Sequence, residues 1–256
     1  MCGILGCLHN KEFSFSLNNF ELSLKEFSYR GPDGSGTKEF VVDNYILKSG
    51  HVRLSIQDLT ELASQPMVSE SKRFCLSFNG EIYNHHEIRK ELESKFHPNW
   101  KGTGDTETLL FLLEAKGVKS SLKKIEGMFS FSLFDLQKKK IYLARDHSGE
   151  KPLYISTSPK SLSFASDLNP LKKFPFFKKE INELALQKYL EFNYIPNPES
   201  IFVGSFKLPP GCFIEIDLNK FKTQFHSSFN SFISAPGVKL IKWWDLDKVR
   251  EKNLDR

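Results

Sequence analysis

The second residue of the chain, Cys2, offers a nucleophile and a base at a single position. We expect the initiator Met1 to be removed, because a following residue as small as cysteine permits it. Cys2 would then carry its thiol and a free α-amine, which titrates near ~8 and can take the thiol proton without a partner side chain. Such a pair could attack a carboxamide. A single free cysteine is more often a small buried apolar side chain, so this chemistry needs support from the rest of the chain.

Two adjacent residues, Asn79 and Gly80, could stabilise the oxyanion that a thiolate produces when it attacks a carboxamide. The asparagine offers a side-chain amide and the glycine a backbone N–H, and losing one such donor typically costs about 2.7–4 kcal/mol in the barrier. A glycine also lets the backbone approach the substrate closely. The alternative is that Asn-Gly is only a tight turn, and the dipeptide by itself favours that interpretation.

Charged residues elsewhere in the chain could bind the α-groups of an amino-acid substrate. Arg53 could hold the α-carboxylate with a two-pronged pair, whereas Glu81 and Asp105 could accept from the α-ammonium, with the adjacent Gly104 in the same binding set. Each has a simpler alternative: a surface ion pair for Arg53, a helix N-cap for Asp105 and plain exposure for Glu81. Four histidines are further candidate bases: His51, His85, His86 and His147. Their spacing does not suggest a metal site.

The composition is that of an ordinary globular protein of 256 residues, with 39% hydrophobic and 26% charged residues. The net charge of +5 is mild and scattered, so no nucleic-acid partner is predicted. Four cysteines match neither a zinc pattern nor a disulfide scaffold, which favours reduced thiols in the cytoplasm. No apolar run approaches ~18 residues and no signal peptide is apparent, so no membrane partner is expected.

The hydrophobic pattern predicts antiparallel strand pairs separated by groups of helices, an α+β fold with two layers of sheet covered by helices. A glycine-rich stretch at 30–36 is predicted to be a sharp loop that serves as a connector or as a wall over the Cys2 thiol. Residues 219–239 show no clean period and are interpreted as a loop or linker. Strands are expected at 4–8, 41–42, 45–47, 74–78, 128–135, 141–144, 152–155, 162–165 and 213–216, and helices at 17–29, 88–96, 102–117, 118–125 and 184–192.

Several short motifs in this order resemble those of class II glutamine amidotransferases. The sequence is most similar to the N-terminal glutaminase domain of glutamine-hydrolysing asparagine synthetases of the B type, densely over residues 2 to about 170. Any one of these motifs is weak evidence, whereas their order along one chain is highly specific. They are Met1–Ile4, Arg30–Asp33, Arg53–Ile56, Gln65–Pro66, Asn79–Asn84, Asp105–Glu107, Arg145–Gly149 and Lys151–Tyr154.

This resemblance implies an N-terminal-nucleophile (Ntn) hydrolase fold, an αββα sandwich of two antiparallel sheets. It implies Cys2 as the nucleophile with its own α-amine as the base, and Asn79 and Gly80 as the oxyanion hole. It assigns the α-groups of L-glutamine to Arg53, Glu81 and Asp105. The implied reaction converts glutamine and water to glutamate and ammonia through a γ-glutamyl thioester, and no metal or cofactor is implied for this step.

The resemblance also predicts a division at residue 215. Residues 2–215 would form the glutaminase domain and 216–256 a linker towards a synthetase domain or partner subunit, which would use ATP and Mg²⁺ to make asparagine or to amidate another acid, such as a sugar carboxylate. No Ser-Gly-Gly-rich pyrophosphate loop is found in this sequence, so a truncated chain, a split enzyme and a stand-alone amidohydrolase stay open. A non-catalytic glutamine-binding or regulatory module is the main alternative function, and a self-cleaving Ntn hydrolase of another family is a weaker one.

Overall fold

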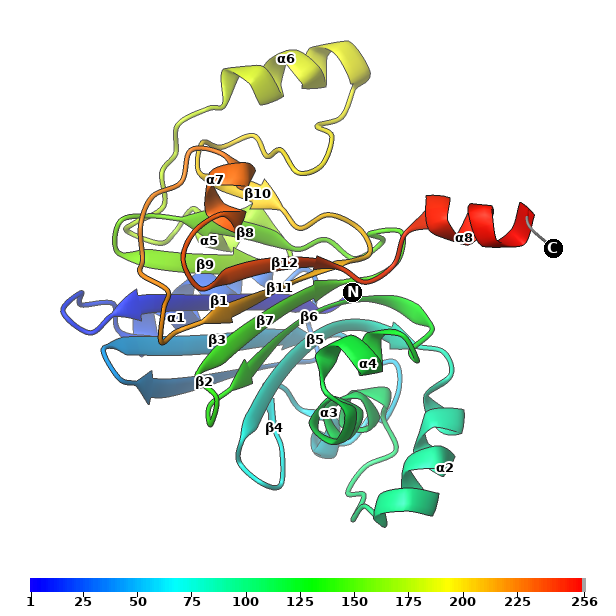
Figure 1. Ribbon diagram of the computed structural model, residues 1–256. Coiled ribbons are helices and arrows are strands. Elements are labelled where there is room, and N and C mark those ends of the chain that lie inside the picture. Colours follow the sequence, from blue (N-terminus) through cyan, green and yellow to red (C-terminus); the bar gives the residue numbers. More distant parts are fainter. Residues whose placement is uncertain (255–256) are drawn as a thin grey trace.

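A computed structural model describes residues 1–254 as two stacked antiparallel sheets with helices on both outer faces (Figure 1). The first sheet has six strands in the order β10-β8-β9-β1-β3-β2, so the N-terminal strand lies in its interior. Its strands are β1 (Gly3–Asn10), β2 (Gly34–Val42), β3 (Tyr45–Arg53), β8 (Tyr154–Thr157), β9 (Ser161–Ala165) and β10 (Ser205–Lys207).

The second sheet also has six strands, in the order β12-β11-β7-β6-β5-β4. The longest pairing joins β5 to β6 from Phe74 opposite Asp135 to Ile82 opposite Gly127. By contrast, β4 pairs with β5 at only two positions, which leaves most of that edge of β5 without a neighbouring strand. The strands are β4 (Met67–Val68), β5 (Phe74–Ile82), β6 (Gly127–Asp135), β7 (Lys140–Arg145), β11 (Cys212–Asp217) and β12 (Val238–Lys242).

Helices cover the outer faces of both sheets, as an αββα arrangement requires. Helix α1 (Leu17–Leu24) packs on β3, and α3 (Asp105–Lys116) packs on β5 and on its neighbour α2 (His85–Phe96). Figure 1 shows α6 (Glu183–Phe192) standing away from the body, and only Ala185 of this helix is buried. The remaining helical segments are η1 (Lys25–Phe27), η2 (Glu61–Ala63), α4 (Val118–Leu122), α5 (Leu168–Leu171), α7 (Phe229–Ile233) and α8 (Leu246–Leu254).

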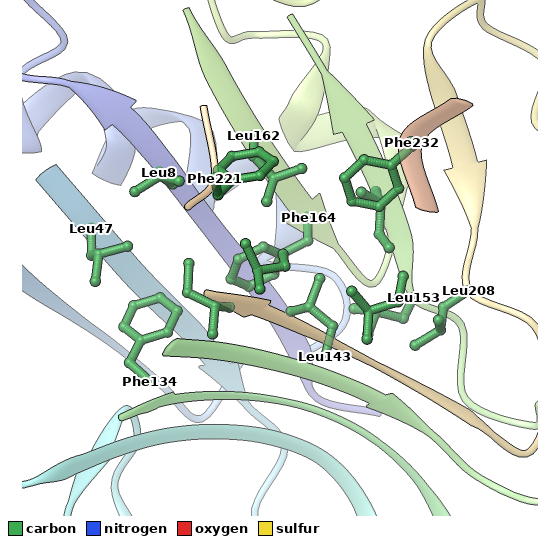
Figure 2. Packing of buried hydrophobic residues seen from close by; sticks show 14 of the residues in the cluster. Leu8, Leu47, Phe134, Leu143, Leu153, Leu162, Phe164, Leu208, Phe221 and Phe232 are labelled. Carbon is green, nitrogen blue, oxygen red and sulfur yellow. The ribbon is translucent and has the colours of Figure 1, made fainter. Parts of the chain in front are cut away.

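The main hydrophobic core lies between the two sheets and is built largely from inward-facing residues of the strands (Figure 2). Leu8 and Phe164 from the first sheet meet Phe134 and Leu143 from the second, and all four are at most 1% exposed. Burying each such side chain contributes about 1.5–3 kcal/mol, before the entropy cost of ordering it. The outer face of the second sheet forms another hydrophobic core with α2 and α3.

One end of the space between the sheets is polar instead of apolar. The hydroxyls of Ser49 on β3 and Ser77 on β5 lie 2.9 Å apart across the sheets. One step of the pleat further along the same strands, His51 and Asn79 are also fully buried. This polar strip connects the apolar core to the end of the sandwich where Cys2 and Arg53 lie.

The fold corrects two expectations about local structure. Asn79 and Gly80 are not a turn: both lie inside β5, paired with Ser130 and Phe129 of β6. The stretch after Pro32 is likewise not a loop throughout, because Gly34 and Gly36 belong to β2 and pair with β3. Asn-Gly and glycine-rich sequences are typical of turns, but here the neighbouring strands pair along their whole length.

The predicted boundary at residue 215 cuts through a strand, because β11 runs from Cys212 to Asp217. The chain then contributes buried side chains to the main core, including Phe229 and Phe232 on α7, and ends the sheet with β12. The sandwich therefore extends to at least Lys242, and residues 219–239 are part of it. Within the described residues, no helix has the length and apolarity needed to cross a bilayer.

Candidate active site

A cavity of about 150 Å³ opens where the ends of β1, β3 and β5 meet the start of α3. The seven residues predicted from the sequence to act in catalysis or substrate binding all line this cavity: Cys2, Arg53, Asn79, Gly80, Glu81, Gly104 and Asp105. None of the four candidate histidines does. The described residues also contain no cluster of His, Cys, Asp and Glu that could hold a metal ion.

The Cys2 thiol lies directly before β1, where the pairing of Gly3 with Val52 places it beside the end of β3. Its Sγ accepts the backbone N–H of Leu54 at 3.4 Å and lies 3.6 Å from the Leu54 carbonyl oxygen. Burial raises the pKa of the thiol, while the Leu54 hydrogen bond, the N-terminal amine and Arg53 act to lower it. Because the net direction is upward, attack by this thiol requires a base close to it.

Of the two roles considered for residues 30–36, a connector or a wall over the thiol, the contacts fit the connector, because this stretch supports the backbone of Cys2. The Arg30 Nε donates to the Cys2 carbonyl oxygen at 3.1 Å, and Asp33 accepts the N–H of Ser55 at 2.7 Å. Neither residue lines the cavity. This loop therefore fixes the start of β1 against the end of β3, and no part of 30–36 forms a wall over Sγ.

The side-chain amide of Asn79 is a buried donor without an acceptor. Its residue is 1% exposed, and Nδ2 has no hydrogen-bond partner among the described residues. Leaving a buried polar group unpaired costs about 1–3 kcal/mol, so such a group in a cavity wall is a candidate for binding a ligand.

The N–H of Gly80 points to the open edge of β5. Backbone N–H groups alternate along a strand, and those of Phe78 and Ile82 both face this edge, where they donate to Gln65 Oε1 at 2.7 Å and Asp105 Oδ2 at 2.9 Å. Gly80 lies between them and faces the same way. A Cβ at this position would lie 2.2 Å from the Met128 carbonyl oxygen, so the glycine is required by close packing against β6.

Asp105 is the first residue of α3, and the N-cap position belongs to Gly104. The N-cap alternative is therefore wrong by one residue. Burial raises the pKa of Asp105 to about 6, against hydrogen bonds from Ile82 and Thr106 that lower it, and the nearby Glu81 raises it further. A buried carboxylate at a cavity wall is well suited to bind a cationic group, which would restore its charged form.

Arg53 is held by backbone carbonyls instead of forming a surface ion pair. Its Nη1 donates to Thr60 O at 2.8 Å and its Nη2 donates to Asp58 O. No carboxylate forms an ion pair with it within residues 1–254. Since a guanidinium has five N–H groups, donors are left over for a ligand carboxylate.

The cavity also contains residues that chemical reasoning from the sequence did not select, among them Gln65, Thr106 and Lys151. Lys151 is 7% exposed, and its Nζ lies 3.4 Å from Met1 Sδ. Gln65 and Lys151 both stand in motifs that carried the family resemblance. Nothing in their residue types alone indicated that they would meet Cys2.

A family model described as glutamine amidotransferase domain matches residues 1–227 of the chain. The chain belongs to this family. The relatives of this glutamine amidotransferase domain include a putative asparagine synthetase [glutamine-hydrolyzing] 2 of Methanocaldococcus jannaschii, 34% identical over 86% of the chain and 45% of the relative. Asparagine synthetase [glutamine-hydrolyzing] 1 of Bacillus subtilis is 33% identical over 94% of the chain and 38% of that protein. The domain thus spans less than half the length of these relatives.

Solved structures support the sandwich fold of this glutamine amidotransferase domain. A glutamine phosphoribosylpyrophosphate amidotransferase from B. subtilis covers 95% of the chain with a TM-score of 0.62, and the chain covers 49% of that structure. A structure of the allosteric regulatory enzyme of purine biosynthesis gives a TM-score of 0.66 with the same coverage. Both are 16% identical, so the likeness concerns the fold, which is the predicted αββα sandwich of two antiparallel sheets.

Proposed function

We propose that this domain hydrolyses L-glutamine to L-glutamate and ammonia through a γ-glutamyl thioester on Cys2. The observation that carries the proposal is the convergence in one cavity of the Cys2 thiol, the unpaired Asn79 amide and the free edge at Gly80. Membership of the glutamine amidotransferase family supports glutamine as the amide donor.

The chemistry begins once Met1 has been removed. The α-amine of Cys2 takes the thiol proton, and the thiolate attacks the γ-carboxamide carbon of glutamine. The resulting oxyanion accepts hydrogen bonds from Asn79 Nδ2 and the Gly80 N–H. The C–N bond then breaks, and the leaving nitrogen takes the proton back from the α-ammonium to depart as ammonia. Water, deprotonated by the same amine, adds to the thioester and releases glutamate.

The far end of the substrate is held by charge. The free donors of Arg53 bind the α-carboxylate, and Asp105 and Glu81 accept from the α-ammonium, next to the backbone of Gly104. Glutamine binding therefore places the carboxamide over Sγ by fixing the opposite end of the molecule.

The ammonia serves an amidation on a synthetase domain or partner subunit. The relatives named above are glutamine-hydrolysing asparagine synthetases, which favours asparagine as the product, and amidation of a sugar carboxylate is the variant. ATP and Mg²⁺ belong to that second reaction. The glutaminase step is proposed to need neither metal nor cofactor.

The test combines mass spectrometry of the mature N-terminus with an assay of glutamate release from glutamine. We expect an N-terminal Cys2, measurable turnover and its loss in Cys2→Ala, with a γ-glutamyl adduct, the mass of glutamate less one water, on trapped wild-type protein. Turnover by Cys2→Ala at the wild-type rate would refute the proposal. Glutamine binding by a processed wild-type protein without turnover would favour the non-catalytic module.

A further inference from the structure

Phe78 directly precedes Asn79, and its backbone N–H and carbonyl oxygen each contact a buried side chain. Its N–H donates to Gln65 Oε1 at 2.7 Å, and its carbonyl oxygen lies 3.0 Å from His51 Nε2. Because the acceptor is a carbonyl, Nε2 must carry the hydrogen. Neither contact belongs to a strand ladder, and both partners come from outside β5.

The Gln65 side chain provides a hydrogen-bond acceptor to β5 beyond the point where β4 ends. Strand β4 pairs only with Leu76 and Cys75, so the ladder ends before Phe78. Gln65 lies two residues before β4, and its side chain accepts the N–H of Phe78 at this edge. The side chain of Asp105 accepts the N–H of Ile82, two residues beyond Gly80. The Gly80 N–H is thus unpaired within residues 1–254, whereas the N–H groups on either side of it along this edge donate to side chains.

Gln65 also connects the two walls of the cavity. Its Nε2 lies 3.4 Å from Thr106 Oγ1, and Thr106 follows Asp105 at the start of α3. One amide side chain therefore contacts both β5 and the helix that carries the proposed ammonium site.

His51 joins the two sheets at the same residue. It projects inward from β3, is fully buried and does not line the cavity. Burial lowers the pKa of His51 to about 4, so the imidazole is neutral near pH 7. A neutral ring with hydrogen on Nε2 makes a permanent link from the first sheet to the carbonyl that precedes Asn79.

We infer that His51 and Gln65 are positioning residues that clamp the Phe78 backbone and thereby hold the Asn79 amide and Gly80 N–H in the geometry that stabilises the oxyanion. Neither residue needs to touch the reacting carbon. Fixed donors are effective because they need no reorganisation when charge develops, and a displacement of about 1 Å can cost ~10²-fold in rate. The inference rests on the proposed glutaminase function.

The main test compares two variants of His51 in the full chain. His51→Gln keeps an N–H donor at a similar reach, whereas His51→Leu removes it. We expect kcat for glutamine hydrolysis to fall about 10- to 10²-fold in His51→Leu, with KM within about twofold of wild type. His51→Gln should retain kcat within about threefold. The γ-aldehyde analogue of glutamine, which forms a tetrahedral adduct with a thiol, should lose affinity for His51→Leu by the same factor as kcat.

Gln65→Met supplies an independent measurement, because methionine matches the length of glutamine and replaces the strong amide-oxygen acceptor of the Phe78 N–H with a weak thioether acceptor. The same loss of kcat and of analogue affinity is expected, and this variant decides the matter if His51→Leu does not fold. A lowered melting temperature with unchanged kcat per folded molecule would overturn the inference, as would equal weakening of glutamine and its aldehyde. Absence of turnover in the wild-type protein would instead refute the proposed function itself.

Discussion

The Asp105 carboxylate accepts the backbone N–H of Ile82 at 2.9 Å, two residues beyond Gly80 on the same edge of β5. This contact fixes the start of helix α3 against the strand that carries the proposed oxyanion hole. The same carboxylate therefore has a structural partner at one oxygen and faces the cavity as a proposed ammonium acceptor.

Replacing Asp105 by Asn separates these two roles. The Asn side-chain oxygen can still accept from Ile82, but the negative charge is lost. A hydrogen bond to a charged group is worth about 1.5–3 kcal/mol, so we expect KM for glutamine to rise about 10- to 100-fold. The effect on kcat should be smaller. Steady-state glutamate release checks this, and a KM equal to that of wild type would place the α-ammonium elsewhere.

The pH dependence of stability offers a second use of the same variant. The pKa of Asp105 is raised by burial from 3.8 to about 6, so the folded state binds this proton more tightly than the unfolded state. The free energy of unfolding should therefore fall as the pH rises from about 4 to about 6, by up to about 3 kcal/mol from this group. Asp105→Asn removes the effect. Urea unfolding at pH 4.5 and 7 should show the variant gaining stability relative to wild type at the higher pH, and a gap independent of pH would contradict it.

Gly80→Ala should destabilise the fold through the backbone of β6. The added methyl group would lie 2.2 Å from Met128 O, and a backbone atom cannot move aside as a flexible side chain can. We expect a loss of about 1–3 kcal/mol in the free energy of unfolding. Gly34→Ala is the matched control, because its Cβ would meet no atom closer than 4.0 Å. Urea denaturation of the pair is the measurement, and equal stabilities would argue against the tight contact.

The contribution of the segment after residue 216 can be measured with two phenylalanines. Phe232 is fully buried in the main core, whereas Phe192 at the end of α6 is 48% exposed. Truncating a buried phenylalanine costs about 3–5 kcal/mol, so Phe232→Ala should lower stability by that order. Phe192→Ala should change it by at most about 0.5 kcal/mol. If Phe232→Ala were as stable as wild type, residues 219–239 would behave as the linker that the sequence suggested.

Much of the architecture was predictable because it depends on periodicity. The alternation of Phe129, Phe131 and Leu133 with serines identified β6, and the spacing of Leu109, Leu112 and Leu113 identified α3. The segment around α7 was missed because its two core phenylalanines lie in a short helix among polar residues. A single turn of helix gives no repeating pattern for the sequence to reveal.

The residue types of the candidate site were predictable from the sequence, whereas the residues that hold its backbone in place were less so. Cys2, Arg53 and Asp105 each suggested a chemical task, and they meet in one cavity. The conformation of Asn79 was not predictable locally, since Asn-Gly favours a turn, whereas the pairing of β5 with β6 from Phe74 to Ile82 places Asn79 inside a strand opposite Ser130. The positioning roles proposed for His51 and Gln65 depend on contacts with the backbone of Phe78 on another strand, which no local pattern encodes.

The brevity of β4 has a consequence for how such a site arises. Had that strand continued alongside β5, its carbonyl groups would have accepted the backbone N–H groups of Phe78, Gly80 and Ile82. Strand β4 instead stops short, side chains accept the N–H groups of Phe78 and Ile82, and the Gly80 N–H between them is left unpaired by any described residue, in the wall of the cavity that Cys2 also lines. In the proposed reaction, the substrate oxygen takes the place that a backbone carbonyl of a longer β4 would have filled.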